Sequence, residues 1–312
     1  MISRIFLIIA AFIIFSALVF ILVPPFIVYK ILLVRTKKSK WGRECSMTTD
    51  KEQMEMFSTG EQWLETYKKF SSDVKINSEG FNLAGIYFDF GFKKSVIIIA
   101  GRSESCLYCC YFAEPYRKSG YNVLVIDNRC HGLSDGKYNT VGYKEYADIL
   151  AWGKFLHDEK NNESVICHGI CIGSTTALYA LIRPECPDYM KGLIADGMFT
   201  TFKESFNNHL IDQHRLQFPT TQIVMLLLSI HSGENAFKKG PVTVIQDYKK
   251  PILFLYSRQD KFSLPKNAEE LYSKCNSKKK LVWFEKGVHS HLRINAPEKY
   301  DDSICEFVKE NF

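Results

Sequence analysis

The stretch "VICHGICIGSTTALYA", Val165 to Ala180, contains an apolar run, then Gly-x-Cys-x-Gly, then a series of small residues. The apolar run predicts a buried strand, and the residues after Gly173 predict a helix. Glycines at 169 and 173 are typical of a tight strand-to-helix turn in which strand and helix approach closely. Such a turn exposes its central residue at a helix N-terminus, where the macrodipole favours negative charge. Cys171 occupies this central position and is the candidate nucleophile.

Short apolar runs alternate with helical segments on both sides of this stretch. Strands are predicted over Val96–Ala100, Val123–Asp127, Val165–His168, Gly192–Ala195, Ile252–Tyr256 and Leu281–Glu285. Helices are predicted over Cys106–Lys118, Gly142–Asp158, Ile172–Ile182, Pro265–Lys274 and Pro297–Lys309, with a β-hairpin over Val74–Gly91 and amphipathic helices over Lys51–Phe70. This repetition predicts one doubly wound α/β sheet with mostly parallel strands.

The alternation stops between about residues 200 and 250. This interval contains "TQIVMLLLSIH", Thr221–His231, and no clear strand. The apolar stretch Ile223–Ile230 is too short for a membrane span, which needs about 20 residues. Long insertions of this kind occur on functional loops, so the interval predicts a helical cap over the strand ends.

The N-terminal segment has 25 consecutive uncharged residues, Ile5–Tyr29. Because a helix of about 20 such residues crosses a bilayer, the segment predicts a transmembrane anchor. It is too long for a cleavable signal peptide and too uniformly apolar for a core helix. Five Lys or Arg residues between Lys30 and Lys40, against Arg4 alone on the other side, predict a single-pass protein of the cell membrane with a cytoplasmic catalytic domain.

Charge and cysteine content exclude several classes of function. Residues 1–43 hold seven basic side chains, which leaves 33 basic and 34 acidic residues in the rest of the chain, so no basic field for nucleic acid is expected. The ten cysteines lie mostly within apolar segments and are interpreted as reduced packing residues. Cys106 and Cys109 have Cys-x-x-Cys spacing without a second ligand pair, so no metal and no cofactor are predicted.

Four motifs, in chain order, resemble the α/β-hydrolase superfamily. "VLVIDNRCHGLSDG" resembles the strand and loop Asp-x-Arg-Gly-His-Gly-x-Ser-x-Gly, with Cys130 in place of a glycine. "HGICIG" resembles the nucleophile elbow Gly-x-Ser-x-Gly, with Cys171 in place of the serine. "PILFLYSRQDKF" resembles the strand that delivers the acid, and "EKGVHSHLRINAPEKY" resembles the histidine loop. Among subgroups, the chain is most similar to bacterial membrane-anchored serine-aminopeptidase-like (S33-type) hydrolases.

The resemblance covers residues from about 74 to 312 and implies an α/β-hydrolase domain there, with the cap at about 200–250. The N-terminal pattern adds a membrane anchor over residues 1–35 and a linker with amphipathic helices over 36–73. The resemblance also implies a catalytic triad in the order nucleophile, acid, base, which Cys171, Asp260 and His289 satisfy.

Other residues compete for two of these roles. His291, His168 and His131 are alternatives to His289, and Asp196 is an alternative acid because some lipases use the end of the preceding strand. His289 is favoured because it follows the last strand closely.

Two backbone amides are the candidate oxyanion donors. One is the N–H of Ile172, directly after the nucleophile. By the resemblance, the other comes from Arg102 in the loop "IIAGRSES", where Ala100-Gly101 replaces the His-Gly of the family. A thiol at a helix N-terminus beside a protonated histidine can have a pKa of about 3.5–7.5, so Cys171 can replace serine and form a thioester. With cysteine at its centre, the turn also resembles that of dienelactone hydrolases and polyhydroxyalkanoate synthases.

The sequence therefore predicts a membrane-anchored hydrolase that cleaves an ester, thioester or lactone of a small-molecule or lipid acyl substrate. Two alternatives remain open: an inactive binding protein that retains the fold, and an acyltransferase that uses the same triad.

Overall fold

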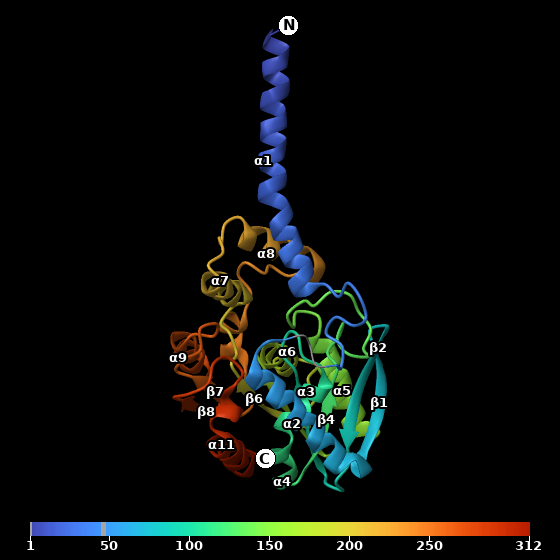
Figure 1. Cartoon of the computed structure of the whole chain (residues 1–312). Helices are drawn as coiled ribbons and strands as arrows, with labels where there is room; N and C mark the ends of the chain where they lie inside the picture. Colours follow the sequence, from blue (N-terminus) through green and yellow to red (C-terminus); the bar gives the residue numbers. More distant parts are fainter. Residues whose placement is uncertain (1, 45–47) are drawn as a thin grey trace.

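The computed structural model describes residues 2–44 and 48–312, without the side chains of residues 2, 3, 13, 14, 17 and 18 (Figure 1). Cys45, interpreted above as a reduced packing residue, lies outside the described residues, as does part of the predicted linker. The nine described cysteines are all free thiols.

One eight-stranded sheet forms the centre of the molecule, in the order β1-β2-β4-β3-β5-β6-β7-β8. The strands are β1 (Ser71–Ser78), β2 (Phe81–Phe88), β3 (Lys94–Ile99), β4 (Tyr121–Ile126), β5 (Ser164–Ile170), β6 (Met190–Asp196), β7 (Ile252–Ser257) and β8 (Lys279–Phe284). β1 and β2 form the predicted hairpin, β2 is antiparallel to β4, and all other pairs are parallel. The predicted α/β sheet is confirmed.

Helices cover both faces of the sheet and enclose two hydrophobic cores (Figure 1). One core packs against α5 (Tyr146–Asp158), α6 (Ile172–Leu181) and α9 (Pro265–Lys274). The other packs against α2 (Lys51–Tyr67), α3 (Cys106–Cys109), α4 (Glu114–Lys118), α10 (Leu292–Asn295) and α11 (Pro297–Asn311). Alternate residues of β3 contribute to the two cores, as expected for a central strand that is buried on both faces.

Two predicted helices differ from those observed. Cys106–Lys118 is divided into α3, a 3₁₀ turn over Cys110–Phe112 and α4, because Pro115 has no backbone N–H for a continuous helix. The helix predicted from Gly142 begins only at Tyr146. The Glu145 carboxylate accepts hydrogen bonds from the amides of Thr140 and Gly142, at 2.7 and 3.0 Å, and holds these residues in a turn.

Between β6 and β7 the chain forms two helices, α7 (Phe202–Asp212) and α8 (Thr220–Ser232), and then 3₁₀ turns over Pro241–Thr243 and Ile245–Asp247. We refer to α7 and α8 as the cap. In Figure 1 the cap lies at the end of the molecule from which α1 (Ile2–Leu33) projects.

The C-terminal end of α1 packs onto the body of the protein. Tyr29, Leu33 and Val34 are buried, and they form a third hydrophobic cluster with cap residues that include Phe206 and Leu228. The backbone amide of Asn139 donates to the Leu33 carbonyl at 2.9 Å. The last turn of α1 is therefore part of the folded body.

The rest of α1 extends away from the body, and most of its described apolar side chains are exposed (Figure 1). Over the side chains that the structure describes, which leave gaps within α1, no helix is long and apolar enough to cross a membrane. The anchor expected over Ile5–Tyr29 stays a prediction.

Candidate active site

Cys171 lies at a sharp turn between β5 and α6. Its backbone has φ 52° and ψ −113°, in the positive-φ range that a non-glycine residue rarely adopts. Such a conformation costs about 1–3 kcal/mol and persists only where the surrounding structure holds it. The thiol is partly exposed, and its own backbone amide donates to the Asp196 carbonyl at 2.8 Å.

The glycines on either side of Cys171 are required by close contacts of strand and helix. A Cβ atom added at Gly169 would lie 2.2 Å from the Ser174 nitrogen, and one added at Gly173 would lie 2.2 Å from the Ile99 carbonyl oxygen. Real Cβ atoms essentially never come this close, so the sequence prediction of a tight strand–turn–helix is confirmed.

Asp260 and His289 meet at the carboxyl end of the sheet. Asp260 follows β7 by three residues, and one of its carboxylate oxygens accepts the amides of Phe262 and Ser263, each at 2.8 Å. The other oxygen lies 2.7 Å from Nδ1 of His289 and accepts its proton. The carboxylate is thereby fixed, and it fixes the orientation of the imidazole.

The free side of His289 faces the site of Cys171. Nε2 of His289 is buried and has no hydrogen-bond partner among the described residues, and both side chains line the same pocket. Burial opposes a charged imidazole, but the negative charges of Asp260 and Cys171 outweigh it and raise the pKa of His289 well above its ordinary value. The arrangement stabilises an imidazolium beside the sulfur.

Two backbone amides lie next to Cys171. Ile172 is the first residue of α6, so its N–H has no acceptor within the helix. Arg102 is in the loop after β3, and a Cβ atom added at neighbouring Gly101 would lie 3.8 Å from the Cβ of Cys171. His131 holds this loop, because its Nε2 donates to the Arg102 carbonyl.

The competing histidines are engaged elsewhere. His131 stacks on Trp41 with ring centroids 4.8 Å apart. Nδ1 of His291 lies 3.0 Å from a carboxylate oxygen of Glu52. His168 is fully buried beneath the turn, where burial lowers its pKa to about 3.

The competing acid, Asp196, bonds to a different partner. The hydroxyl of Tyr300 donates to one of its carboxylate oxygens at 2.7 Å. Burial raises the pKa of Asp196 to about 7. Asp260, not Asp196, is hydrogen-bonded to the imidazole of His289.

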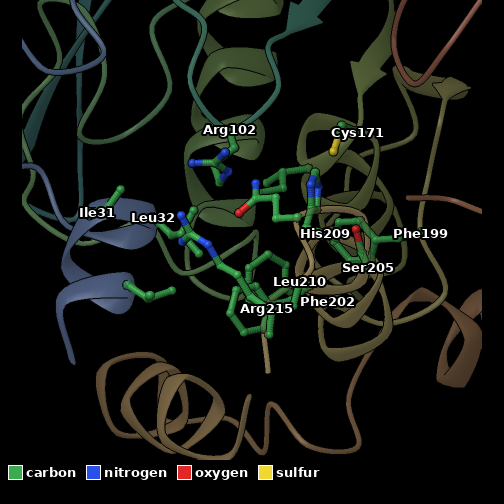
Figure 2. Close-up of a pocket in the computed structure, with 14 residues that line it drawn as sticks. Ile31, Leu32, Arg102, Cys171, Phe199, Phe202, Ser205, His209, Leu210 and Arg215 are labelled. Atoms are coloured by element: carbon green, nitrogen blue, oxygen red, sulfur yellow. The ribbon is translucent and has the colours of Figure 1, made fainter. Parts of the chain in front are cut away.

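Two pockets meet at Cys171, and Figure 2 shows the residues that line the first of them. The first, which we call the apolar cavity, has a volume of about 290 Å³. Its apolar walls come from the end of α1, from α6, from α7 of the cap and from the segment just before α7: Val28, Ile31, Leu32, Ile172, Phe199, Phe202, Phe206 and Leu210. The second, the polar pocket, has a volume of about 220 Å³ and includes Asp50, Glu104, His289 and His291. Arg102, Cys171 and His209 line both.

Three contributions to this site are absent from the sequence prediction: His209, Arg215 and the end of α1. His209, on α7, stacks on Phe262 with ring centroids 3.6 Å apart, and burial lowers its pKa to about 3, so it is neutral. The cap contains no motif that marks these residues, since their position depends on contacts between segments far apart in sequence.

Comparisons with known proteins agree with this geometry. A family model described as "alpha/beta hydrolase fold" matches residues 94–222. The uncharacterized protein YqkD of Bacillus subtilis is 28% identical over 257 residues, which cover 81% of this chain and 82% of that protein. The uncharacterized membrane protein YNL320W of Saccharomyces cerevisiae is 25% identical over 62% of this chain, and the match spans 63% of that protein, less than two thirds of its length.

Among solved structures, the esterase Pf2001 of Pyrococcus furiosus superposes with a TM-score of 0.68 at 24% identity, over 80% of this chain and 94% of that one. At this identity the likeness shows a shared fold. The family-model match spans β3 to β6 and includes the turn at Cys171, and the sheet order extends the same fold to β8. The chain therefore has the α/β-hydrolase fold, and residues 94–222 match the family model of that name.

Proposed function

We propose that this protein hydrolyses a carboxylic ester or thioester, with Cys171 as nucleophile, His289 as acid and base, and Asp260 as the group that orients His289. The observation that carries the proposal is the imidazole of His289, whose Nδ1 is bound at 2.7 Å by Asp260 and whose Nε2 lacks a partner next to the strained turn of Cys171. The match of residues 94–222 to the α/β-hydrolase model and the fold shared with an esterase support hydrolase activity.

In the proposed reaction, the Cys171 sulfur attacks the acyl carbon after His289 takes its proton. The amides of Ile172 and Arg102 donate to the oxyanion of the tetrahedral intermediate. This intermediate collapses as His289 protonates the leaving alcohol or thiol, which leaves a thioester on Cys171. His289 then removes a proton from water, the hydroxide attacks the thioester carbon, and the acid is released as the thiol is restored.

The test is turnover of short and long 4-nitrophenyl esters and acyl thioesters by the wild type and by Cys171→Ala. We expect the substitution to remove nearly all activity, and His289→Ala to do the same with little further loss in the double variant, because the groups act as a unit. Cys186→Ala is the matched control, since Cys186 is another partly exposed thiol and lines neither pocket.

The two alternatives give different outcomes in the same assay. Full activity in Cys171→Ala would refute the nucleophile. A Cys171 that resists alkylation, as read by mass spectrometry, together with no turnover of any ester or thioester, would favour an inactive binding protein. Acyl transfer would appear as a new ester when an added alcohol competes with water.

We also propose that α1 anchors the protein in a membrane, with the catalytic body in the cytoplasm. The uncharged run Ile5–Tyr29, its projection from the body (Figure 1) and the basic residues after it support this topology. The yeast relative is described as a membrane protein. In a Lys238→Cys variant, exposed on the body, an impermeant maleimide should label the introduced thiol only after the cells are permeabilised. Labelling of intact cells would refute this orientation.

A further inference from the structure

We propose that the acyl group of the substrate is anionic: an apolar chain of medium length that carries a carboxylate or phosphate, bound in the apolar cavity with its negative group at Arg102 and Arg215. The assignment of this group as the acyl part of a substrate rests on the proposed hydrolase function. The recognition of an anionic chain rests on the cavity alone.

The charge of the apolar cavity is entirely positive. Arg102 and Arg215 line it, and its described lining includes no Asp or Glu. Figure 2 shows both arginine side chains among the residues that line the same cavity as Cys171. Arginine has a planar array of donors that suits carboxylate and phosphate oxygens.

Neither arginine has a counter-ion within the described residues, since no ion pair within 4.0 Å involves either guanidinium. Glu104 is the nearest acid in the sequence, but its carboxylate accepts hydrogen bonds from Gln53 and Ser103. Arg102 is partly buried, and burial lowers its pKa although the charges of Glu104 and Cys171 act in the opposite direction. For Arg102, a guanidinium partly removed from water without a partner is costly, and a bound anion would supply the partner. Arg215 is exposed, so it would add a second charged contact to the anion at the mouth of the cavity.

The rest of the cavity is suited to an aliphatic chain. Four aromatic or aliphatic residues of the cap side, Phe199, Phe202, Phe206 and Leu210, face Val28, Ile31 and Leu32 of α1. The volume of about 290 Å³ is at the lower end of ligand pockets, which range over about 300–1,000 Å³. One chain of medium length fits this space better than a lipid with two chains.

The charges that line the polar pocket favour an anion on the acyl side of the scissile bond rather than on the leaving group. Arg102 lines both pockets, but Asp50 and Glu104 line only the polar pocket, so a negatively charged leaving group would meet two carboxylates there. An anion in the apolar cavity would meet Arg102 and Arg215 and no carboxylate among the described lining residues. An acyl group with a negative end in the apolar cavity and an uncharged or cationic leaving group in the polar pocket matches both sides of Cys171.

The first arm of the test compares two soluble substrates of equal chain length, the 4-nitrophenyl monoester of octanedioic acid and 4-nitrophenyl octanoate. We expect the wild type to favour the carboxylate ester by about tenfold or more in kcat/KM, as hydrogen bonds to charged groups typically provide. Arg102→Gln and Arg215→Gln should each reduce this ratio. Lys238→Gln, which removes an exposed charge outside the cavity, is the matched control and should leave the ratio unchanged.

The second arm measures binding without catalysis. Cys171→Ala should bind the monomethyl ester of octanedioic acid more tightly than the dimethyl ester in calorimetry, and Arg215→Gln should abolish the difference. If no variant hydrolyses any ester, the proposed function fails while this arm still decides the present proposal. Equal binding of the two esters, or a preference that survives both arginine substitutions, would overturn it.

A third arm separates recognition of the substrate from attraction to an anionic membrane. Turnover of the neutral ester is compared in vesicles of phosphatidylcholine alone and in vesicles that include phosphatidylglycerol. The proposal requires the selectivity to appear with soluble monomers. A charge effect seen only with phosphatidylglycerol vesicles would assign the arginines to the lipid surface and overturn the proposal.

Discussion

Cys171 combines a strained backbone with a partly exposed thiol at a helix N-terminus. The turn holds its φ at 52°, and the same turn places the sulfur at the N-terminal end of α6. A helix N-terminus favours the thiolate, and the raised pKa of His289 favours the imidazolium. In the proposed mechanism the two residues react as an ion pair, which a serine at this position would not form.

Replacement of the thiol tests this difference. Cys171→Ser should lower kcat/KM for 4-nitrophenyl esters by about tenfold or more, because a hydroxyl has a far higher pKa and depends on general-base help. The helix and the turn should be retained, so circular dichroism and the unfolding midpoint serve as controls. A serine variant as fast as the wild type would show that the thiolate has no special role.

His289 predicts a pH dependence of stability. Its folded-state pKa is raised by Asp260 and Cys171 above the unfolded value of about 6.5. Protonated His289 should therefore contribute stability fully below about pH 6.5, and this contribution should be lost as the pH rises through the folded-state pKa. The measurement is the difference in free energy of unfolding between wild type and His289→Gln as a function of pH.

Asp260→Asn provides the comparison for that titration. It removes the carboxylate bonded to Nδ1, so the folded-state pKa of His289 should fall and the pH-dependent difference should shrink. A histidine resonance that titrates near pH 6.5 in the wild type, assigned to His289 by NMR, would contradict the prediction.

At the scale of elements, the strands were the most predictable part of the molecule. A run such as Val96–Ala100 is apolar without alternation because β3 is covered on both faces. The composition of such a run therefore predicts a buried central strand. The motifs also predict that Asp260 follows β7 and that His289 follows β8. The two side chains are hydrogen-bonded in the structure. Helix boundaries were less predictable. The break at Pro115 and the turn before Tyr146 depend on local hydrogen bonding rather than on hydrophobic period.

The contact between β5, α6 and β3 predicts a large effect of a single methyl group. Gly173→Ala would place its Cβ 2.2 Å from the Ile99 carbonyl, so helix and strand must separate. We expect a loss of about 1–3 kcal/mol or more in the free energy of unfolding, as for other overpacked cores. Gly42→Ala is the matched control, since its nearest contact, at 3.4 Å, is close to ordinary. Equal stability of the two variants in denaturant titrations would refute the argument.

At the scale of the whole molecule, the apolar cavity is formed by segments that lie far apart in the sequence. The uncharged run of α1 predicts an anchor, but nothing in it predicts that Val28, Ile31 and Leu32 line a pocket with Arg215. That assembly depends on packing between residues about 200 positions apart, such as Tyr29 and His231, whose side chains are hydrogen-bonded at 2.8 Å. The pattern of residues in one sequence does not predict contacts between segments so far apart.

Two truncations test this assembly. A chain that begins at residue 22 keeps the buried residues Tyr29, Leu33 and Val34, and should retain the unfolding midpoint and the turnover of soluble esters. A chain that begins at residue 36 lacks them and should be several kcal/mol less stable, at about 1.5–3 kcal/mol for each buried apolar side chain. It should also lose selectivity for chain length. Equal stability and selectivity of the two truncations would show that α1 is only a tether.

The shared use of α1 has a consequence for how this enzyme could diversify. The residues that form one wall of the apolar cavity belong to the end of an N-terminal apolar stretch, and a membrane anchor requires of such a stretch only that it be long and apolar. An exchange such as Leu32→Phe would keep this segment apolar and yet reduce the volume of the apolar cavity. Related chains with identical catalytic motifs could thus accept different substrates through changes in a segment that sequence comparisons usually discard.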